Sequence, residues 1–260
     1  MNIIKENMKK ISYALCISTL LLTSCNTSKK DNNETMGIKE ETVKKTLKAD
    51  LDNKKASFEE KAPDEKKKIY VEGIQSVVDN KIVENALQVG DTAINFTLKN
   101  ASNKEVNLYS ELEKGPVVLM WYRGGWCPYC NLTLQHMQQS LPEFKDQGAN
   151  LLALTPELPD SSISTKEKNE LEFQVLSDIN NKIAKEYKVV YKLTDDVAKS
   201  YENSFGLSKY NGNNDSELPL AATYLIGKDK IIKYAFLDAE YRNRAEPKDI
   251  IAALKKLNNK

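Results

Sequence analysis

The feature that most constrains the fold is a pair of cysteines three positions apart, Cys127 and Cys130, which separates an apolar run from a helical pattern. The run 117–122 is apolar and rich in β-branched and aromatic residues, which indicates a fully buried strand. Pro128 suits the first turn of a helix, and apolar residues recur at helical spacing after it. The two thiols therefore lie where a strand leads into the N-terminus of a helix.

A thiol at this position is expected to be reactive. Unbonded backbone N–H groups and the positive end of the helix dipole stabilise a thiolate there, which lowers the pKa of the thiol. Arg123 adds a positive charge four residues before the first cysteine. We therefore expect a redox-active CxxC, with Cys127, Cys130 and Arg123 as its catalytic residues.

Two other uses of such a cysteine pair are less favoured. A zinc site needs about four nitrogen or sulfur ligands, but His136 is the one histidine and the remaining cysteines, Cys16 and Cys25, lie near the N-terminus. A structural disulfide in a binding or scaffold protein would close a very short loop and give little entropic stabilisation. The sequence therefore predicts no metal and no other cofactor. We expect His136 to be a surface or packing residue, because its spacing from the cysteines puts it on a different helical face.

The N-terminus has the pattern of a bacterial lipoprotein signal. Three lysines precede an apolar stretch, 11–22, that is too short for a confident membrane span. The stretch leads into Leu-Thr-Ser-Cys, in which Cys25 stands where a lipidated cysteine is expected. We expect residues 1–24 to be removed and Cys25 to anchor the protein in the cell envelope, with Asn26 favouring the outer membrane. The free thiols of the mature chain are then those of the CxxC, which fits an oxidising compartment.

Residues 25–86 are expected to form a polar tether and a helical extension. The extension has two helical patterns separated by Pro63, each with apolar residues on one face. We expect this pair to pack on its own domain, because an apolar stripe usually buries itself; a homodimer contact and a partner site are the alternatives. The apolar positions are Val43, Leu47, Leu51 and Phe58 in the first pattern, and Ile69, Ile74, Val77 and Val78 in the second.

Residues 87–260 have the pattern of one α/β domain, in which helices cover a mixed central sheet. A helix is expected at 162–169, with Thr165 on its solvated side. A hairpin of two strands near the C-terminus is followed by a closing helix. Pro142 is expected to kink or break the helix that follows the cysteines, and Gly206 to end a later helix. Pro219 is expected just before the hairpin, and Pro247 in the first turn of the closing helix.

Three stretches of the chain resemble the peroxiredoxin-like branch of the alkyl hydroperoxide reductase/thiol-specific antioxidant family, within the thioredoxin fold. Residues 89–98 are similar to its GDxAPDFxL opening, and 123–131 to its RGxxCPxC signature. Residues 218–226 together with 241–247 are similar to its closing PxPATFxI…DYxxRxEP pattern. The resemblance covers about 87–257.

The resemblance implies that a cysteine thiolate reduces a peroxide, that a second thiol resolves the product to a disulfide, and that an external, thioredoxin-like dithiol donor reduces it. The sequence departs from ordinary peroxiredoxins in two ways. Cys127 stands where the family has Thr or Ser, and Arg123 stands where it has Pro. The arginine usual just ahead of the later strand is replaced by Ala221 or Ala222, so we expect Arg123 to supply the missing charge.

These departures leave two assignments of the cysteines open. By the peroxiredoxin register Cys130 attacks the peroxide and Cys127 resolves. By the thioredoxin register Cys127 attacks, and exposure favours this assignment because Cys130 lies one helical turn further in. A thiol peroxidase is favoured over a thiol–disulfide oxidoreductase acting on envelope proteins, because the flanking stretches, rather than the motif, distinguish the two.

The remaining expectations concern the surroundings of the CxxC and its partners. If the resemblance holds, Trp126, Pro128 and Pro219 line the substrate groove, with Pro219 facing the cysteines across the fold. The substrate is a peroxide or a disulfide, and the formal net charge of +1 gives no case for nucleic acid. The residues expected either at the rim of the site or in an ordinary solvated turn are Tyr241, Arg242 and Arg244.

Overall fold

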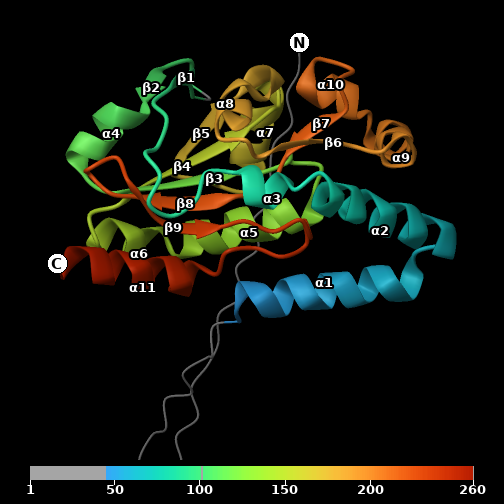
Figure 1. The fold of residues 1–260 in the computed structure, drawn as a ribbon, viewed down its shortest axis with the longest axis horizontal. Coiled ribbons are helices and arrows are strands. Elements are labelled where there is room, and N and C mark those ends of the chain that lie inside the picture. The colour runs from blue at the N-terminus through green and yellow to red at the C-terminus, as the bar shows by residue number, and fades with distance from the viewer. Residues whose placement is uncertain (1–44, 101, 260) are drawn as a thin grey trace, which may run out of the picture. The chain divides into compact units, whose positions relative to one another are not determined.

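A five-stranded mixed sheet lies at the centre of the computed structural model, which describes residues 45–100 and 102–259 (Figure 1). The strand order is β5-β4-β3-β8-β9; β3 pairs parallel with β4 and antiparallel with β8. All five side chains of β3 are buried, as expected for a central strand covered on both faces. The strands are β3 (Val117–Trp121), β4 (Asn150–Thr155), β5 (Gln174–Ser177), β8 (Thr223–Ile226) and β9 (Ile232–Phe236).

Two smaller antiparallel sheets lie beside the central one. The first joins β1 (Thr97–Lys99) to β2 (Glu105–Asn107), and the second joins β6 (Val190–Lys192) to β7 (Glu217–Pro219). Each of these strands has only three residues. Such short strands carry too little alternation to stand out in the sequence, and β6 and β7 were not expected from it.

Helices cover both faces of the central sheet, and side chains of β3 alternate between the two cores that result. Leu119 and Trp121 pack on the core that includes residues of α2, α4 and α8 to α10. Val118 and Met120 pack on the core of α1, α5, α6 and α11. The helices are α1 (Leu47–Lys61), α2 (Asp64–Asp79), α3 (Ile82–Asn85), α4 (Leu108–Lys114), α5 (Pro128–Gln139), α6 (Leu141–Asp146), α7 (Pro159–Lys168), α8 (Lys182–Glu186), α9 (Asp195–Phe205), α10 (Leu207–Asn211) and α11 (Pro247–Asn258), with a 3-10 turn at Ile179–Asn181.

The mixed sheet covered by helices confirms the predicted fold class, and the residues expected to bound helices do so. Pro128 and Pro247 occupy the first turns of α5 and α11, and Pro142 follows the break between α5 and α6. Gly206 ends α9 with a φ of +68°, a conformation that favours glycine. One expectation was wrong: Thr165 of α7 is buried, because this helix turns its small polar side chains, rather than an apolar stripe, toward the domain.

The two helices of the extension pack on the domain itself. On α1, Leu47 and Leu51 are buried in the core beneath α5, and Asp50 lies 2.8 Å from His136 Nε2. On α2, the Tyr70 ring meets the Tyr201 ring of α9 edge-on, with 5.7 Å between centroids. The predicted leader, Cys25 and the tether lie outside the described residues.

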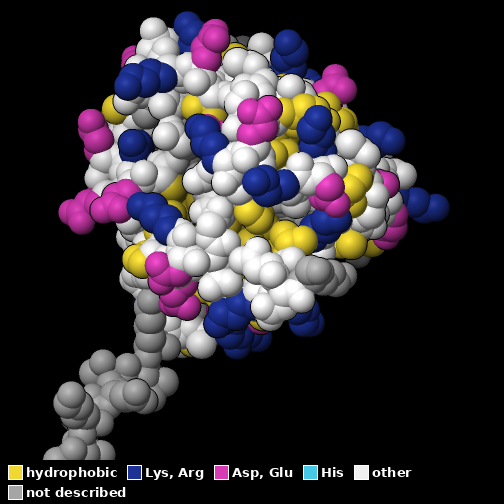
Figure 2. All heavy atoms as spheres, turned by 90° about the vertical axis from the view of Figure 1, so that its left-hand side faces the viewer, with side chains coloured by type: hydrophobic (Ala, Val, Ile, Leu, Met, Phe, Trp, Pro, Cys, Tyr) yellow, Lys and Arg dark blue, Asp and Glu magenta, His cyan; other side chains and the backbone are white. Residues whose placement is uncertain are grey.

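Charged side chains are mixed rather than segregated on the face shown in Figure 2. Lys and Arg side chains alternate there with Asp and Glu side chains, so the described part of this face has no extensive patch of one sign. Within residues 45–100 and 102–259, no helix is both long enough and apolar enough to cross a membrane.

Candidate active site

The loop between β3 and α5 is held in place by a buried carboxylate. The Gly125 N–H donates to Glu157 Oε1 at 2.9 Å, and the hydroxyls of Thr155 and Thr165 donate to Oε2 at 3.4 Å each. A Cβ on Gly125 would lie 2.0 Å from Thr165 Oγ1, so only glycine fits at this point of the loop. Burial raises the pKa of Glu157, and its hydrogen bonds offset part of that effect.

Both cysteines are reduced and buried at the start of α5. Cys127 is the N-cap residue and Cys130 belongs to the first turn, with exposed fractions of 1% and 0%. Exposure therefore does not distinguish the two thiols, and it gives no support for Cys127 as the attacking one. Its sulfur is covered by the side chain of Arg123, which folds back from the preceding loop.

Each sulfur is in contact with a guanidinium group. Arg123 Nη1 lies 3.9 Å from Cys127 Sγ, and Arg244 Nη2 lies 3.6 Å from Cys130 Sγ. Both arginines are buried, with exposed fractions of 1% and 7%. Arg123 was expected at the site, and Arg244 supplies a second charge near the sulfurs.

The surroundings shift the pKa values of the two thiols in opposite directions. Burial raises the pKa of each, but at Cys130 a hydrogen bond from Cys127 and the charges of Arg244 and Arg123 outweigh burial and hold the pKa well below its usual value. At Cys127 burial and the hydrogen bond to Cys130 raise the pKa well above its usual value. The geometry therefore favours Cys130 as the thiolate and Cys127 as the thiol that donates to it.

Arg123 lies among aromatic rings. Its Nη2 donates to the Tyr201 hydroxyl at 2.6 Å, and its guanidinium lies 4.2 Å from the Tyr241 ring centroid and 5.1 Å from that of Trp126. Trp126 is half-buried and stacks on Phe205, with centroids 4.3 Å apart. No carboxylate in the described part of the chain pairs with Arg123, so its positive charge is free to act on the sulfurs.

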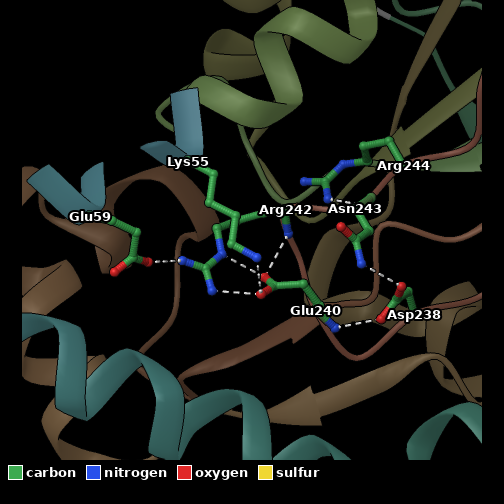
Figure 3. Close-up of polar contacts among 7 residues, drawn as sticks. All are labelled: Lys55, Glu59, Asp238, Glu240, Arg242, Asn243 and Arg244. Carbon is green, nitrogen blue, oxygen red and sulfur yellow. Dashed lines mark hydrogen bonds and ion pairs between the residues drawn. The ribbon is translucent and has the colours of Figure 1, made fainter. Parts of the chain in front are cut away.

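The loop that carries Arg244 is tied to α1 by ion pairs (Figure 3). Arg242 donates to Glu240 through Nε and Nη2, at 2.8 and 2.6 Å, and its Nη1 reaches Glu59 of α1 at 3.0 Å. Lys55, one turn earlier on α1, lies 3.7 Å from the same Glu240 carboxylate. The extension thus helps to hold the loop from which Arg244 reaches Cys130.

The structure brings together only some of the residues predicted for the site. Trp126 lies in the loop between β3 and α5, with its ring against Arg123, whereas Pro128 is exposed on the first turn of α5. Pro219 is buried in β7 and pairs with Val190 of β6, and its position opposite the cysteines stays a prediction. His136 packs between α5 and α1 and is separate from the site.

Three residues of the site were missed or left undecided by sequence reasoning. Arg244 had a signal, since it belongs to the closing stretch that resembles the family pattern. Tyr201 and Glu157 had none, because their roles depend on contacts with residues far away in the chain. The described residues contain no cluster of three or more His, Cys, Asp or Glu side chains that could hold a metal ion.

Comparison with known proteins shows the family of the domain that carries the cysteines. Residues 89–235 match the model of the AhpC/TSA family. The chain belongs to this family. Its relatives include a putative chloroplastic peroxiredoxin Q of Oryza sativa subsp. indica, 28% identical over 68% of this chain and 70% of the relative. Another is the thiol-disulfide oxidoreductase ResA of Bacillus thuringiensis, 28% identical over 41% of this chain and 61% of the relative.

Solved structures of a peroxidoxin and a peroxiredoxin share the fold. Peroxidoxin BcpB from Mycobacterium tuberculosis matches with a TM-score of 0.53 and 18% identity, over 66% of this chain and 98% of that one. The reduced 2-Cys peroxiredoxin of Plasmodium vivax matches with a TM-score of 0.52 and 21% identity, over 66% and 83%. Membership of this family makes the protein a thiol-dependent peroxidase or oxidoreductase.

Proposed function

We propose that the protein is a thiol peroxidase in which Cys130 attacks the peroxide and Cys127 resolves the product. The observation that carries this proposal is the guanidinium of Arg244, 3.6 Å from Cys130 Sγ, in a site where the pKa of that thiol is held low. A thiolate is the reactive form of cysteine. A nearby fixed cation also stabilises the negative charge that develops on the peroxide oxygen as the O–O bond breaks.

The proposed reaction has two steps on the chain. The Cys130 thiolate attacks one peroxide oxygen, a sulfur–oxygen bond forms, and the other oxygen leaves with the O–O electron pair and takes up a proton from solvent. The sulfur is thereby oxidised to a sulfenic acid and the peroxide is reduced. Cys127 then attacks the sulfenic sulfur, and its proton leaves with the hydroxide as water. The resulting CxxC disulfide is reduced by an external, thioredoxin-like dithiol.

A thiol–disulfide oxidoreductase is the second candidate, favoured by the likeness to ResA and by a tryptophan directly before the first cysteine. Burial argues for the peroxidase. Both cysteines are at most 1% exposed, so a protein disulfide would reach them only after the start of α5 opened, whereas a peroxide is about the size of one or two waters. The dithiol donor then acts on the oxidised form, once a disulfide has replaced the buried thiolate.

The cysteine roles are tested by trapping the sulfenic acid with dimedone in Cys127→Ser and Cys130→Ser. After one equivalent of hydrogen peroxide, mass spectrometry should find the adduct on Cys130 of the first variant and none on the second. The opposite pattern would reverse the assignment. Absence of any adduct, together with a wild-type CxxC that peroxide leaves reduced, would remove the peroxidase proposal.

The two candidate functions are separated by Arg123→Ala. An arginine close to the reacting sulfurs assists peroxide cleavage in the transition state. Disulfide exchange instead depends mainly on the thiolate fraction and the acidity of the leaving thiol. Peroxide oxidation should therefore slow far more than exchange with a small disulfide. Equal slowing of both reactions, read from stopped-flow tryptophan fluorescence, would favour the oxidoreductase.

We further propose that lipidation of Cys25 anchors the enzyme in the cell envelope. The support is the sequence pattern of basic, apolar and small residues before that cysteine. A Cys25→Ser protein, expressed with its leader in a bacterial host, should leave the membrane fraction while its isolated form keeps peroxidase activity. Retention in membranes would contradict the anchor.

A further inference from the structure

We propose that the disulfide between Cys127 and Cys130 is a strong oxidant, because forming it leaves the buried guanidiniums of Arg123 and Arg244 without a counter-charge. The reduced protein is then the more stable form, and a weakly reducing dithiol suffices to regenerate it. This inference rests on the proposed function, in which the CxxC cycles between two thiols and a disulfide. It goes further by setting the class of dithiol that can act as the reductant.

In the reduced protein the Cys130 thiolate balances part of the positive charge of the site. Arg244 Nη2 lies 3.6 Å from Cys130 Sγ, and Arg123 Nη1 lies 3.9 Å from Cys127 Sγ. Both arginines and both cysteines are buried, so water and salt screen these charges only weakly. The low pKa of Cys130 reflects the same attraction, because a nearby cation favours the charged form of a thiol.

Neither arginine is paired with a carboxylate in the part of the chain that the structure describes. Arg123 Nη2 donates to the Tyr201 hydroxyl, and aromatic rings flank its guanidinium. Arg244 Nη1 donates to the Asn243 carbonyl oxygen at 2.7 Å. These partners are neutral, so the thiolate is the counter-ion that contacts this pair of guanidiniums.

Arg242 has the opposite arrangement on the same loop (Figure 3). Its guanidinium lies 2.6 Å from Glu240 and 3.0 Å from Glu59, and both carboxylates keep their charge whatever the state of the cysteines. The buried carboxylate of Glu157 is engaged by a backbone N–H and two threonine hydroxyls, and burial raises its pKa. Oxidation of the cysteines therefore removes the counter-charge of the other two arginines but not that of Arg242.

Oxidation takes the negative charge out of the site. When Cys127 attacks the Cys130 sulfenic acid, a sulfur–sulfur bond forms, the sulfur–oxygen bond breaks, and the hydroxide leaves with the Cys127 proton as water. The site then holds two buried positive charges and no thiolate, and a buried charge without a partner is costly. The disulfide itself offsets little of this cost, because a CxxC bridge closes a short loop. A disulfide whose reduced form is stabilised in this way has a high reduction potential.

The reverse exchange restores the counter-charge. The incoming dithiol loses two electrons and two protons as its own disulfide forms. Cys130 leaves as the thiolate, Cys127 takes up one proton, and the other proton goes to solvent. The return of the thiolate beside Arg244 drives this exchange, so a short, unstrained cysteine pair can accept the disulfide.

The test mixes equal amounts of the oxidised protein and a reduced peptide of residues 124–133, which has the same two cysteines without either arginine. The protein carries Cys16→Ser and Cys25→Ser so that the CxxC supplies its only thiols. It is oxidised beforehand with oxidised glutathione, and a trace of glutathione carries the exchange, which is read by mass spectrometry after acid quenching. We expect an equilibrium constant of about 100 for transfer to the peptide, a difference of about 60 mV that leaves about nine-tenths of the peptide oxidised.

Denaturant unfolding of the two redox forms gives a second, independent readout. The oxidised protein should be less stable than the reduced one by about 2.7 kcal/mol, which is the same hundredfold factor. Arg244→Ala should lower the exchange constant about tenfold and bring the two stabilities closer, since one uncompensated charge remains. Arg244→Lys keeps a charge and should keep most of the difference. Leu51→Ala is the matched structural control, because it removes a buried contact and should weaken both forms equally.

The outcomes separate this inference from the function on which it rests, because the exchange needs no peroxide. An exchange constant near one, or an oxidised form as stable as the reduced form, overturns the inference and leaves the peroxidase proposal to the dimedone experiment. An unchanged difference between the redox forms in Arg244→Ala removes the arginines as its cause and also overturns it. If that variant does not fold, Arg123→Ala removes the other charge and should narrow the difference; no narrowing there counts equally against the inference.

Discussion

Replacing Arg244 with alanine should slow peroxide oxidation of the CxxC by making Cys130 harder to ionise. The change removes a guanidinium that lies 3.6 Å from Cys130 Sγ. At that separation and an effective dielectric constant of about 20, two unit charges attract by about 4–5 kcal/mol. Water entering the vacated space and the remaining charge of Arg123 will offset part of the lost attraction on the Cys130 thiolate. A net loss of about 2 kcal/mol corresponds to a roughly thirtyfold smaller thiolate fraction wherever the thiol form dominates.

The sign of the pH dependence follows from the direction of the shift. Charges and the hydrogen bond hold the pKa of Cys130 below its usual value, so its thiolate persists as pH falls through the range in which a free thiol protonates. The related gain in stability is complete above the unfolded pKa of about 8.5 and is lost as pH falls through the folded pKa. In Arg244→Ala, both the loss of thiolate and the loss of peroxide reactivity should move to higher pH.

The measurement is an ultraviolet titration of the thiolate, with parallel peroxide rates, in a Cys127→Ser background. Serine removes the second thiol but keeps a hydroxyl that can donate to the Cys130 sulfur. Lys55→Ala is the matched control, because it removes a cation that contacts the same loop through Glu240 but makes no contact with the sulfur. Arg244→Lys should recover part of the effect. Titration curves that superimpose with and without Arg244 would refute the electrostatic argument.

Two further predictions concern how the site is held. Gly125→Ala should destabilise the protein by about 1–3 kcal/mol in denaturant unfolding, because the new Cβ meets Thr165 Oγ1, and Thr165→Ala should relieve part of the loss; wild-type stability would contradict the close fit. Lys45 and His136 hold the pKa of Asp50 below its usual value. The Asp50 carboxylate therefore stabilises the fold above its unfolded pKa, and this stabilisation is lost as pH falls through its folded pKa. Asp50→Asn should therefore cost less than about 1 kcal/mol, seen as faster amide exchange in α1 alone, and exchange equal to wild type would show that the pair contributes nothing.

Much of the fold was predictable because its signals are local. The buried run of β3, the proline at the start of α5 and the glycine that ends α9 each act within a few residues. The hairpin of β8 and β9 was visible for the same reason. In contrast, α7 has few apolar residues, so its periodicity could not show that Thr165 faces Gly125 in the loop between β3 and α5.

The candidate site was predictable only in part because its chemistry comes from distant contacts. The sequence placed Arg123, Cys127 and Cys130 together since they are neighbours in the chain. The contact of Arg244 with Cys130 joins residues 114 positions apart, and it is the contact on which the proposed role of Cys130 as the attacking thiol rests. Exposure inferred from position on a helix favoured the other cysteine, because it took no account of the side chains that other segments fold over the helix.

The family-matched segment ends at residue 235, before Arg244, and begins after both helices of the extension. The cysteine motif and Arg123 thus lie inside the matched segment, whereas Arg244, which contacts Cys130, lies outside it. Two proteins could share the matched segment almost unchanged and still differ in thiol acidity, through changes at the ends alone. Transplanting only the matched segment into another protein would therefore carry over the cysteines and Arg123 without the guanidinium of Arg244 beside Cys130.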